Sequence, residues 1–413
     1  MHWGPKKSGR LSVLLLVTAV VLSACGSNKE ETNEGSGQDG GAPADQTVKI
    51  GVIAPLSGSL APLGVGIKNA AELAVKEANE KRLVKGWKIV LDAQDDAANP
   101  DTGGAVANKL ASDGAVAGVI GTLNSSVAQQ VQKPLNDAGI VVVSPANTNP
   151  SLTQGLDPAN KKRPFATYFR VATTDAIQGP FAADFAYDTG GFKNAVVIHD
   201  KKTYGQGLAL AFKERFEAKG GKVSTVETIE PNDEDFSTVL SKVKRFNPDL
   251  IYYGGEFPAA SLITDQADLA KIKAPLMGGD GIFDKTYIDV AKQAGEGDLA
   301  TSVGAPTAQL ASAKAFVDAY KAAGYSDDHS AYGAYSYDAT NVIIQALAKV
   351  LPDKKALDAK TRQDIVAAVQ ATDLDGATGK VSFDEYGDTT TKILTVYKVE
   401  AGAWKPQKTA EFK

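Results

Sequence analysis

The sequence reads Gly121-Thr122-Leu123-Asn124-Ser125-Ser126 after one apolar segment and, one helical pattern later, Val141-Val142-Val143-Ser144-Pro145-Ala146-Asn147-Thr148. In each half, a short apolar strand runs into a loop of small hydroxylated residues. Ligands of open α/β sheets bind at the carboxyl ends of neighbouring strands. A helix that begins at these serines would also direct free backbone N–H groups outward, which favours an anion such as a carboxylate. An isolated Ser-Ser pair would indicate only a helix cap, whereas two such loops indicate a binding site.

Strand-like and helix-like segments alternate on both sides of these loops. One series of strands is predicted at 48–54, 87–91, 116–120 and 140–143, and a second at 195–199, 222–228, 250–253 and 275–278. Repeated βα order predicts parallel sheets with helices on both faces. We therefore predict an α/β fold with two doubly wound parallel-sheet lobes.

The segments after residue 299 open no third series of strands. We therefore assign the strand-like segment 299–303 and the helical segments 312–323 and 335–350 to the first lobe. Two alternating segments, 379–383 and 392–398, are predicted as strands joined by a turn, and we assign them to the second lobe.

The N-terminal segment has the pattern of a secretory signal peptide. Residues 1–10 contain three basic residues and no acid, and residues 11–22 form an unbroken apolar run. Leu22-Ser23-Ala24-Cys25 resembles the lipobox of bacterial lipoproteins, in which the cysteine is lipidated and becomes the first mature residue. We therefore predict a signal peptide at 1–24, lipidation of Cys25 and a flexible polar tether at 25–46.

Composition and motifs argue against several classes of function. Removing residues 1–24 takes the formal net charge from −5 to −8, which argues against nucleic-acid binding. The sequence contains no catalytic histidine or cysteine motif and no Walker sequence. The stretch at 64–69 lacks the third glycine of a dinucleotide fingerprint, and the acidic cluster at 92–96 lacks the spacing of a calcium loop. We therefore predict a non-catalytic protein without cofactor or metal.

Three loops of the second series have the chemistry of a binding site. Residues 200–205, 254–257 and 278–281 each follow a strand end and should meet at one edge of the sheet. Tyr204 offers an apolar face with a polar tip. Asp280, a carboxylate between glycines, suits a cation, although Gly-Asp-Gly is also a common turn.

In order and spacing these motifs resemble one family, the solute-binding lipoproteins or periplasmic proteins of ABC importers for branched-chain amino acids, the leucine/isoleucine/valine-binding group. The stretches that carry the resemblance are 50–58, 121–126, 144–148, 199–205, 235–237, 252–255 and 277–281. The resemblance spans residue 48 to about residue 388. It implies a type I periplasmic binding protein fold, in which a three-crossing hinge joins lobe 1 (47–168 plus 300–378) to lobe 2 (169–299 plus 379–413) and the lobes close on a ligand.

The resemblance also implies the contacts of an amino-acid ligand. Ser125 and Thr148 would supply hydroxyl and N–H donors to the α-carboxylate. The backbone carbonyl of Ala146 would accept from the α-ammonium, and Asp280, in place of the family's usual glutamate, would be its counter-charge. A zwitterion needs this division into donors at one end and acceptors at the other.

The rest of the implied site contains two departures from the family. Tyr204 would pack over the ligand from the second lobe, and Tyr332 matches an aromatic position at the side-chain end. Leu63 and Glu256 stand where the best-known leucine binders have tyrosines, and Asn124 replaces one cysteine of the family's disulfide. A buried carboxylate is costly without a partner, so either Glu256 faces an amine or amide of the ligand or it faces solvent at the mouth of the site.

The resemblance implies a non-enzymatic protein that captures an amino acid, with a branched side chain expected, and delivers it to the permease subunits of an ABC importer. It would be extracytoplasmic, anchored through Cys25 to the outer face of the cell membrane or on the periplasmic side. Three alternatives stay open: a ligand sensor for a separate signalling partner, a binder of a polar or cationic amino acid or amide, and an amide hydrolase that uses Ser125, His199 and Glu256.

Overall fold

The computed structural model describes residues 45–412 of the 413-residue chain. The predicted signal peptide at 1–24, the lipidation site Cys25 and nearly all of the tether at 25–46 lie outside the described residues. None of the helices between residues 45 and 412 combines the length and the apolar character that crossing a bilayer requires.

The first sheet contains five parallel strands in the order β2-β1-β3-β4-β5. They are β1 (Gln46–Ala54), β2 (Trp87–Asp95), β3 (Val116–Gly121), β4 (Val141–Ser144) and β5 (Tyr168–Arg170). Successive residues point to opposite faces. Val119 and Val142 therefore pack on the side of α2 (Pro100–Ser112) and α3 (Ser125–Asp137), whereas Ile120 and Val143 pack on the side of α1 (Ala61–Glu80) and α11 (Gly333–Val350).

The second sheet contains seven strands in the order β14-β13-β10-β9-β8-β6-β7. They are β6 (Asn194–His199), β7 (Lys222–Thr228), β8 (Leu250–Gly254), β9 (Leu276–Gly278), β10 (Leu299–Val303), β13 (Ile393–Glu400) and β14 (Ala403–Glu411). The strands from β7 to β10 are parallel, and β13 and β14 add an antiparallel edge.

Helices cover both faces of the second sheet. Phe181 of α5 (Asp175–Asp184) and Phe212 of α6 (Thr203–Ala218) pack with Val197 and Tyr252 on one face. The other face contacts α7 (Ser237–Lys244), α8 (Phe257–Leu269) and α9 (Lys285–Ala291). The predicted α/β fold with two doubly wound lobes is therefore confirmed.

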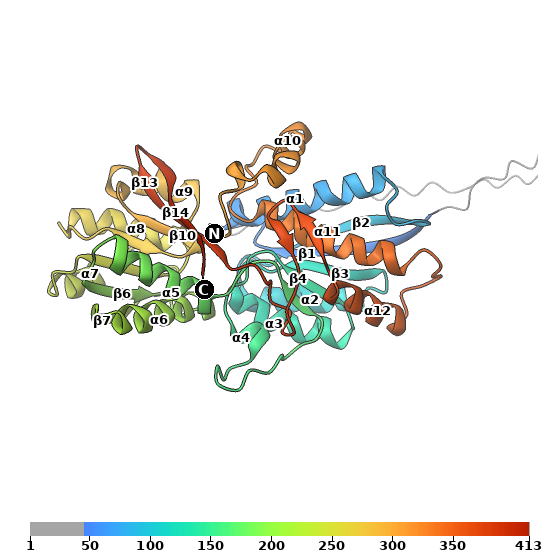
Figure 1. Cartoon of the computed structure of the whole chain (residues 1–413), viewed down its shortest axis with the longest axis horizontal. Helices are drawn as coiled ribbons and strands as arrows, with labels where there is room; N and C mark the ends of the chain where they lie inside the picture. The colour runs from blue at the N-terminus through green and yellow to red at the C-terminus, as the bar shows by residue number, and fades with distance from the viewer. Residues whose placement is uncertain (1–44, 413) are drawn as a thin grey trace, which may run out of the picture. The chain divides into compact units, whose positions relative to one another are not determined.

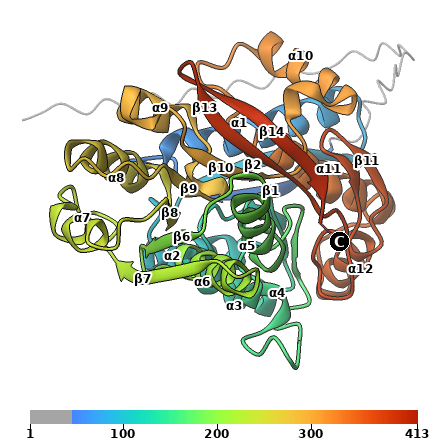
Figure 2. The same cartoon turned by 60° about the vertical axis from the view of Figure 1, so that its left-hand side comes forward.

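Three segments cross between the sheets, as the resemblance implied. They are residues 171–174 before α5, 304–313 before α10 (Lys314–Ala323), and the stretch from β12 (Gly379–Val381) to β13. After the second crossing, α10 packs against α1, and α12 (Ala359–Gln370) packs against α11. Orange α11 accordingly lies with the blue and teal strands of the first sheet, and red β13 and β14 lie with the second (Figures 1 and 2).

Two sequence predictions about the late strands were wrong. Segment 299–303 does not belong to the first lobe, because β10 pairs with β9 and β13 in the second sheet. Of the two tail segments assigned to the second lobe, only 392–398 joins the second sheet, where β13 pairs with β10 and β14, whereas β12 pairs with β11 (Leu374–Gly376) in a separate two-stranded sheet. A short buried strand has no periodic pattern that specifies which sheet it joins, so the sequence pattern could not predict these strand partners. The remaining lobe boundaries stay predictions.

A buried ion pair connects the first and third crossings. Nε of Arg170, at the end of β5, lies 2.5 Å from Oδ1 of Asp388. The same guanidinium donates to the carbonyl oxygen of Asn149 at 2.7 Å, and Gln154 donates to the other oxygen of Asp388 at 2.7 Å. Burial would raise the pKa of Asp388, but the Arg170 charge and these hydrogen bonds hold that pKa below its usual range. The hinge is thus fixed beside the loop that contains Thr148.

Candidate functional site

All seven predicted ligand-binding residues line one cavity between the lobes. They are Ser125, Ala146, Thr148, Tyr204, Glu256, Asp280 and Tyr332, and Leu63, Leu123, Asn124 and Gly281 complete the lining. The volume of the cavity is about 20 Å³, room for about one water molecule. The loops of the two lobes therefore contact each other around the site, and a larger ligand enters only when these loops separate.

The first lobe contributes the amino end of α3 and the loop after β4. Asn124 precedes the helix in an extended conformation, so that the first N–H groups, at Ser125 and after, are directed out of it. The Ser144 hydroxyl accepts from the Ala146 N–H at 3.2 Å and so bends the second loop back toward the first. Within residues 45–412, no hydrogen bond occupies the Ala146 carbonyl or the Thr148 N–H. This side of the cavity therefore offers free N–H donors at the start of α3 and at Thr148, together with one free acceptor, the Ala146 carbonyl.

The opposite side of the cavity contains the carboxylate of Asp280, which is 1% exposed. Its Oδ1 accepts from the Tyr204 hydroxyl at 2.8 Å and from Nε2 of Gln178 at 2.9 Å. Its Oδ2 accepts from the Tyr332 hydroxyl, which comes from the first lobe, at 2.8 Å. Burial raises the pKa of Asp280 against the lowering effect of these hydrogen bonds. All three donors are neutral, and no cation of the described chain forms an ion pair with Asp280.

A second buried carboxylate, Asp175, lies behind Asp280 at the start of α5. Burial, followed by the charge of Asp280, raises the pKa of Asp175 to about 8. Gln178 donates to both carboxylates, at 3.2 Å to Asp175 and at 2.9 Å to Asp280. The sequence analysis missed Asp175 and Gln178, because an aspartate that opens a helix looks like an ordinary cap.

Glu256 matches neither of the two alternatives in full. It is only 8% exposed, so the solvent-facing alternative is wrong. Its Oε1 accepts from Nδ2 of Asn124 across the lobes at 2.6 Å, and its Oε2 pairs with Nζ of Lys202 at 3.1 Å. Asp200 lies beside this pair, and burial together with the Glu256 charge raises the pKa of Asp200 to about 8. The protein thus supplies its own cation for Glu256 and uses the glutamate to connect the lobes.

The other surfaces of the cavity are apolar. Leu63 and Leu123 are 1% and 8% exposed. The hydroxyl groups of Tyr204 and Tyr332 are both directed at Asp280, so their rings present carbon to the remaining space. A ligand side chain without charge fits these walls.

The structure does not assemble the other candidate sites. His199 is buried, its Nδ1 accepts from the Lys201 N–H at 3.2 Å, and it does not line the cavity that contains Ser125. Burial lowers the pKa of His199. Among residues 45–412 no group of three or more histidine, cysteine, aspartate or glutamate side chains could hold a metal ion. Asp95 instead accepts from the Leu56 N–H at 2.8 Å and stabilises the first loop.

Sequence comparison agrees with this geometry. The pattern of the periplasmic binding protein family matches residues 47–403. A Leu/Ile/Val-binding protein of Rhizobium johnstonii is 32% identical over 360 residues, which cover 87% of this chain and 93% of the relative. The chain belongs to the periplasmic binding proteins, in their branched-chain amino acid binding group. The predicted family and its solute-binding, non-enzymatic class are confirmed.

Solved structures place this periplasmic binding protein in the same fold. A leucine binding protein of Thermotoga maritima superposes with a TM-score of 0.79 at 29% identity, covering 88% of this chain and 99% of that one. The branched-chain amino acid transporter substrate binding protein of Streptococcus pneumoniae, in complex with isoleucine, gives a TM-score of 0.78 at 27% identity, covering 89% and 100%. These comparisons do not test the individual ligand contacts, which stay predictions.

The raised pKa of Asp175 makes stability depend on pH. An unfolded aspartate titrates near pH 4, so the stability from the bound proton is complete below about pH 4 and is lost as the pH rises through about 8. Asp175→Asn keeps one acceptor oxygen and removes the titration. Between pH 5 and 9, the free energy of unfolding of the variant should fall less than that of the parent, by on the order of 4 kcal/mol, which is about 1.4 kcal/mol for each pH unit between 5 and 8. Urea unfolding at both pH values measures this difference.

The matched control is Asp235→Asn, because Asp235 is exposed. The control should keep the pH dependence of the parent between pH 5 and 9. Equal pH dependence in Asp175→Asn and the parent would contradict a proton bound at Asp175 in the folded protein.

Proposed function

We propose that this protein captures a branched-chain amino acid as a zwitterion between its two lobes and delivers it to the permease subunits of an ABC importer. One observation carries the proposal. The Asp280 carboxylate is buried, accepts hydrogen bonds from neutral donors only, and forms no ion pair with a cation of the described chain. An α-ammonium supplies that cation. The names of the relatives and the isoleucine complex of the Streptococcus pneumoniae protein support the same ligand class.

The two sides of the cavity match the two ends of a zwitterion. The N–H groups at Ser125 and Thr148 and their hydroxyls receive the α-carboxylate at the amino end of α3. The Ala146 carbonyl and Asp280 receive the α-ammonium. Donors lie on the first lobe and the counter-charge on the second, so a bound amino acid connects the lobes, and Tyr332 reaches Asp280 only when they close. The closed form is what a permease can recognise.

The charges around the side-chain end favour a neutral side chain. Glu256 is paired with Lys202 at 3.1 Å and bonded to Asn124 at 2.6 Å. A cationic side chain would have to compete with Lys202 for that carboxylate, which is costly in a buried site. Leu63 and Leu123 provide the apolar contacts that an aliphatic side chain needs. These features favour leucine, isoleucine or valine over a cationic or polar amino acid.

Replacing Asp280 by asparagine tests the ammonium contact. Asp280→Asn keeps the shape and two of the hydrogen-bonding positions but removes the charge. We expect a loss of about 2 to 5 kcal/mol in leucine binding, roughly a 30-fold to 4,000-fold rise in Kd. Isothermal titration calorimetry on the purified protein measures it, with Asp235→Asn as the control that keeps parental affinity. A variant that binds leucine as tightly as the parent would remove Asp280 from this role.

We also propose that Cys25 carries the lipid that holds the protein at the outer face of the cell membrane, on the strength of Leu22-Ser23-Ala24-Cys25. A lipid chain stabilises membrane attachment through its buried methylene groups. Cys25→Ser should therefore move the protein from the membrane fraction to the soluble extracytoplasmic fraction, as measured by fractionation and immunoblotting. Uncleaved parent serves as the mobility reference on the blot and shows whether the signal peptide of the variant has been removed. A cleaved variant that stays in the membrane fraction would refute lipidation at Cys25.

A further inference from the structure

A second and larger cavity lies between the lobes, beside the crossing at 304–313. Its volume is about 490 Å³, within the range of small-molecule sites. Its lining comes from both lobes and from the crossing itself. The second lobe contributes 283–286, 302–303, Tyr397, Trp404 and Pro406, and the first lobe contributes Pro62, 327–331 and Tyr335. No residue of this lining belongs to the cavity around Asp280. The two are therefore separate spaces.

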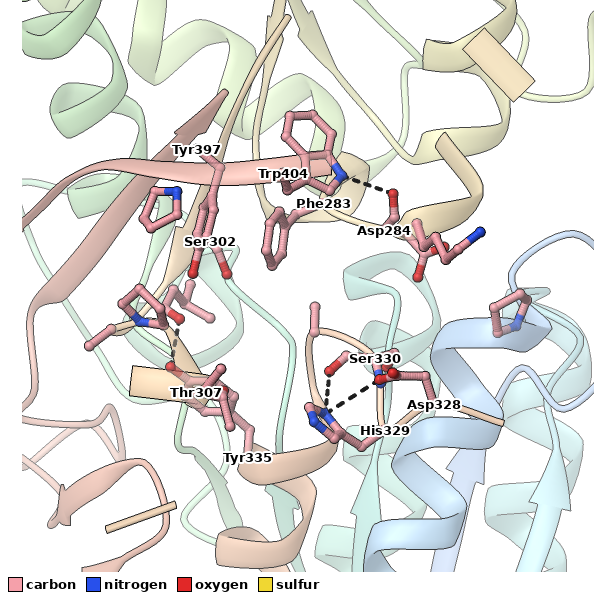
Figure 3. A pocket seen from close by; sticks show the side chains of 18 of the residues that line it. Phe283, Asp284, Ser302, Thr307, Asp328, His329, Ser330, Tyr335, Tyr397 and Trp404 are labelled. Atoms are coloured by element: carbon pink, nitrogen blue, oxygen red, sulfur yellow. Dashed lines mark hydrogen bonds and ion pairs between the residues drawn. The ribbon is translucent and has the colours of Figure 1, made fainter. Parts of the chain in front are cut away.

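One wall of this second cavity is aromatic. The ring centroids of Phe283 and Tyr397 lie 4.1 Å apart, and those of Phe283 and Trp404 lie 5.8 Å apart. Figure 3 shows these three side chains on one side of the cavity and Asp328, His329 and Ser330 on the other. Nε1 of Trp404 donates to the carbonyl oxygen of Asp284 at 2.9 Å. The indole N–H thus has a hydrogen-bond partner within the protein, and the face of the indole ring is available to an apolar or cationic group.

Three buried polar side chains of the lining have capacity to bind a ligand. Asp284 is 8% exposed, and its Oδ1 caps α9 by accepting from the Thr286 N–H at 2.7 Å. The other oxygen of Asp284 has no hydrogen bond or ion pair within residues 45–412. The hydroxyl groups of Ser302 and Tyr397, each on a residue 6% exposed, have no hydrogen-bond partner in the same part of the chain. None of these three oxygen atoms is fully enclosed by protein, so each is open to the cavity and available to a ligand.

The charge of the lining is negative. Asp284 lies on one wall, and Asp327 and Asp328 lie on the other. Lys285, the first residue of α9, also lines the cavity, but it forms its ion pair with Asp289 on the next turn of the helix. Nδ1 of His329 lies 2.9 Å from the Ser330 carbonyl oxygen. A carboxylate beside aromatic faces attracts an organic cation through both charge and the ring quadrupole.

We propose that this cavity is a second ligand site, which binds a small organic cation with an apolar body. The ammonium group lies at the free oxygen of Asp284, and the apolar body lies against Phe283 and Trp404, with the Tyr397 and Ser302 hydroxyls on the other side of Phe283 (Figure 3). A ligand here contacts both lobes. The loops that line this cavity continue into the first site, since Phe283 follows Gly281 by two residues and Tyr332 follows Ser330 by two. Occupancy therefore favours the closed arrangement of the lobes.

Tryptamine and its neutral analogue tryptophol form a matched pair of probes, because they differ only in the amine and the hydroxyl. Isothermal titration calorimetry of the purified full-length protein should show tryptamine binding with Kd below roughly 1 mM and at least about tenfold more tightly than tryptophol. This comparison needs no variant. Equal binding of the two probes, or no binding of tryptamine at that concentration, would overturn the proposal.

Two variants locate the bound probe. Asp284→Asn keeps the oxygen that caps α9 and should weaken tryptamine binding at least about tenfold. Asp235→Asn, at an exposed residue that lines neither cavity, should leave tryptamine binding unchanged. Parental tryptamine binding in Asp284→Asn, or an equal loss in Asp235→Asn, would show that the probe does not occupy this site.

Discussion

The site depends on one constraint: the Asp280 carboxylate is buried, and all of its hydrogen-bond donors are neutral. Burial of an ionised carboxylate costs several kcal/mol unless hydrogen bonds and a counter-charge compensate it. Tyr204 and Gln178 approach it from two helices of the second lobe, and Tyr332 approaches it from the first. The closed arrangement of the lobes thus completes the hydrogen bonds of one carboxylate. The counter-charge is left for the ligand.

Other buried carboxylates of this protein are stabilised from within the chain. Asp388 is paired with Arg170 and so fixes the hinge, and Glu256 is paired with Lys202 at the edge of the site. Asp338 accepts from the backbone N–H groups of Ala377 and Thr378 at 2.7 and 2.8 Å. Within residues 45–412, Asp280 forms no ion pair and accepts no backbone pair of this kind, although it is just as buried. The contrast separates these three structural carboxylates from Asp280, which lines the cavity and is available to a ligand.

Much of the fold and of the site was predictable from local sequence. The apolar strands and the small polar loops at their ends determine where the two lobes present their binding edges, and Ser125, Thr148, Tyr204 and Asp280 do converge there. Less predictable were features that depend on distant partners. The sheet that β10 joins, the pairing of β12 with β11 and the contact of Lys202 with Glu256 are set by packing between segments. No spacing within one segment encodes them.

Two analogues of leucine, each blocked at one end, provide the most direct test of the account. N-acetyl-leucine lacks the ammonium group, and leucinamide lacks the carboxylate, while both keep the side chain. Isothermal titration calorimetry on the purified protein should show binding of leucine and at least about a hundredfold weaker binding of N-acetyl-leucine, with leucinamide weakened as well. Binding of N-acetyl-leucine as tight as that of leucine would contradict the claim that the buried Asp280 carboxylate takes its counter-charge from the ligand.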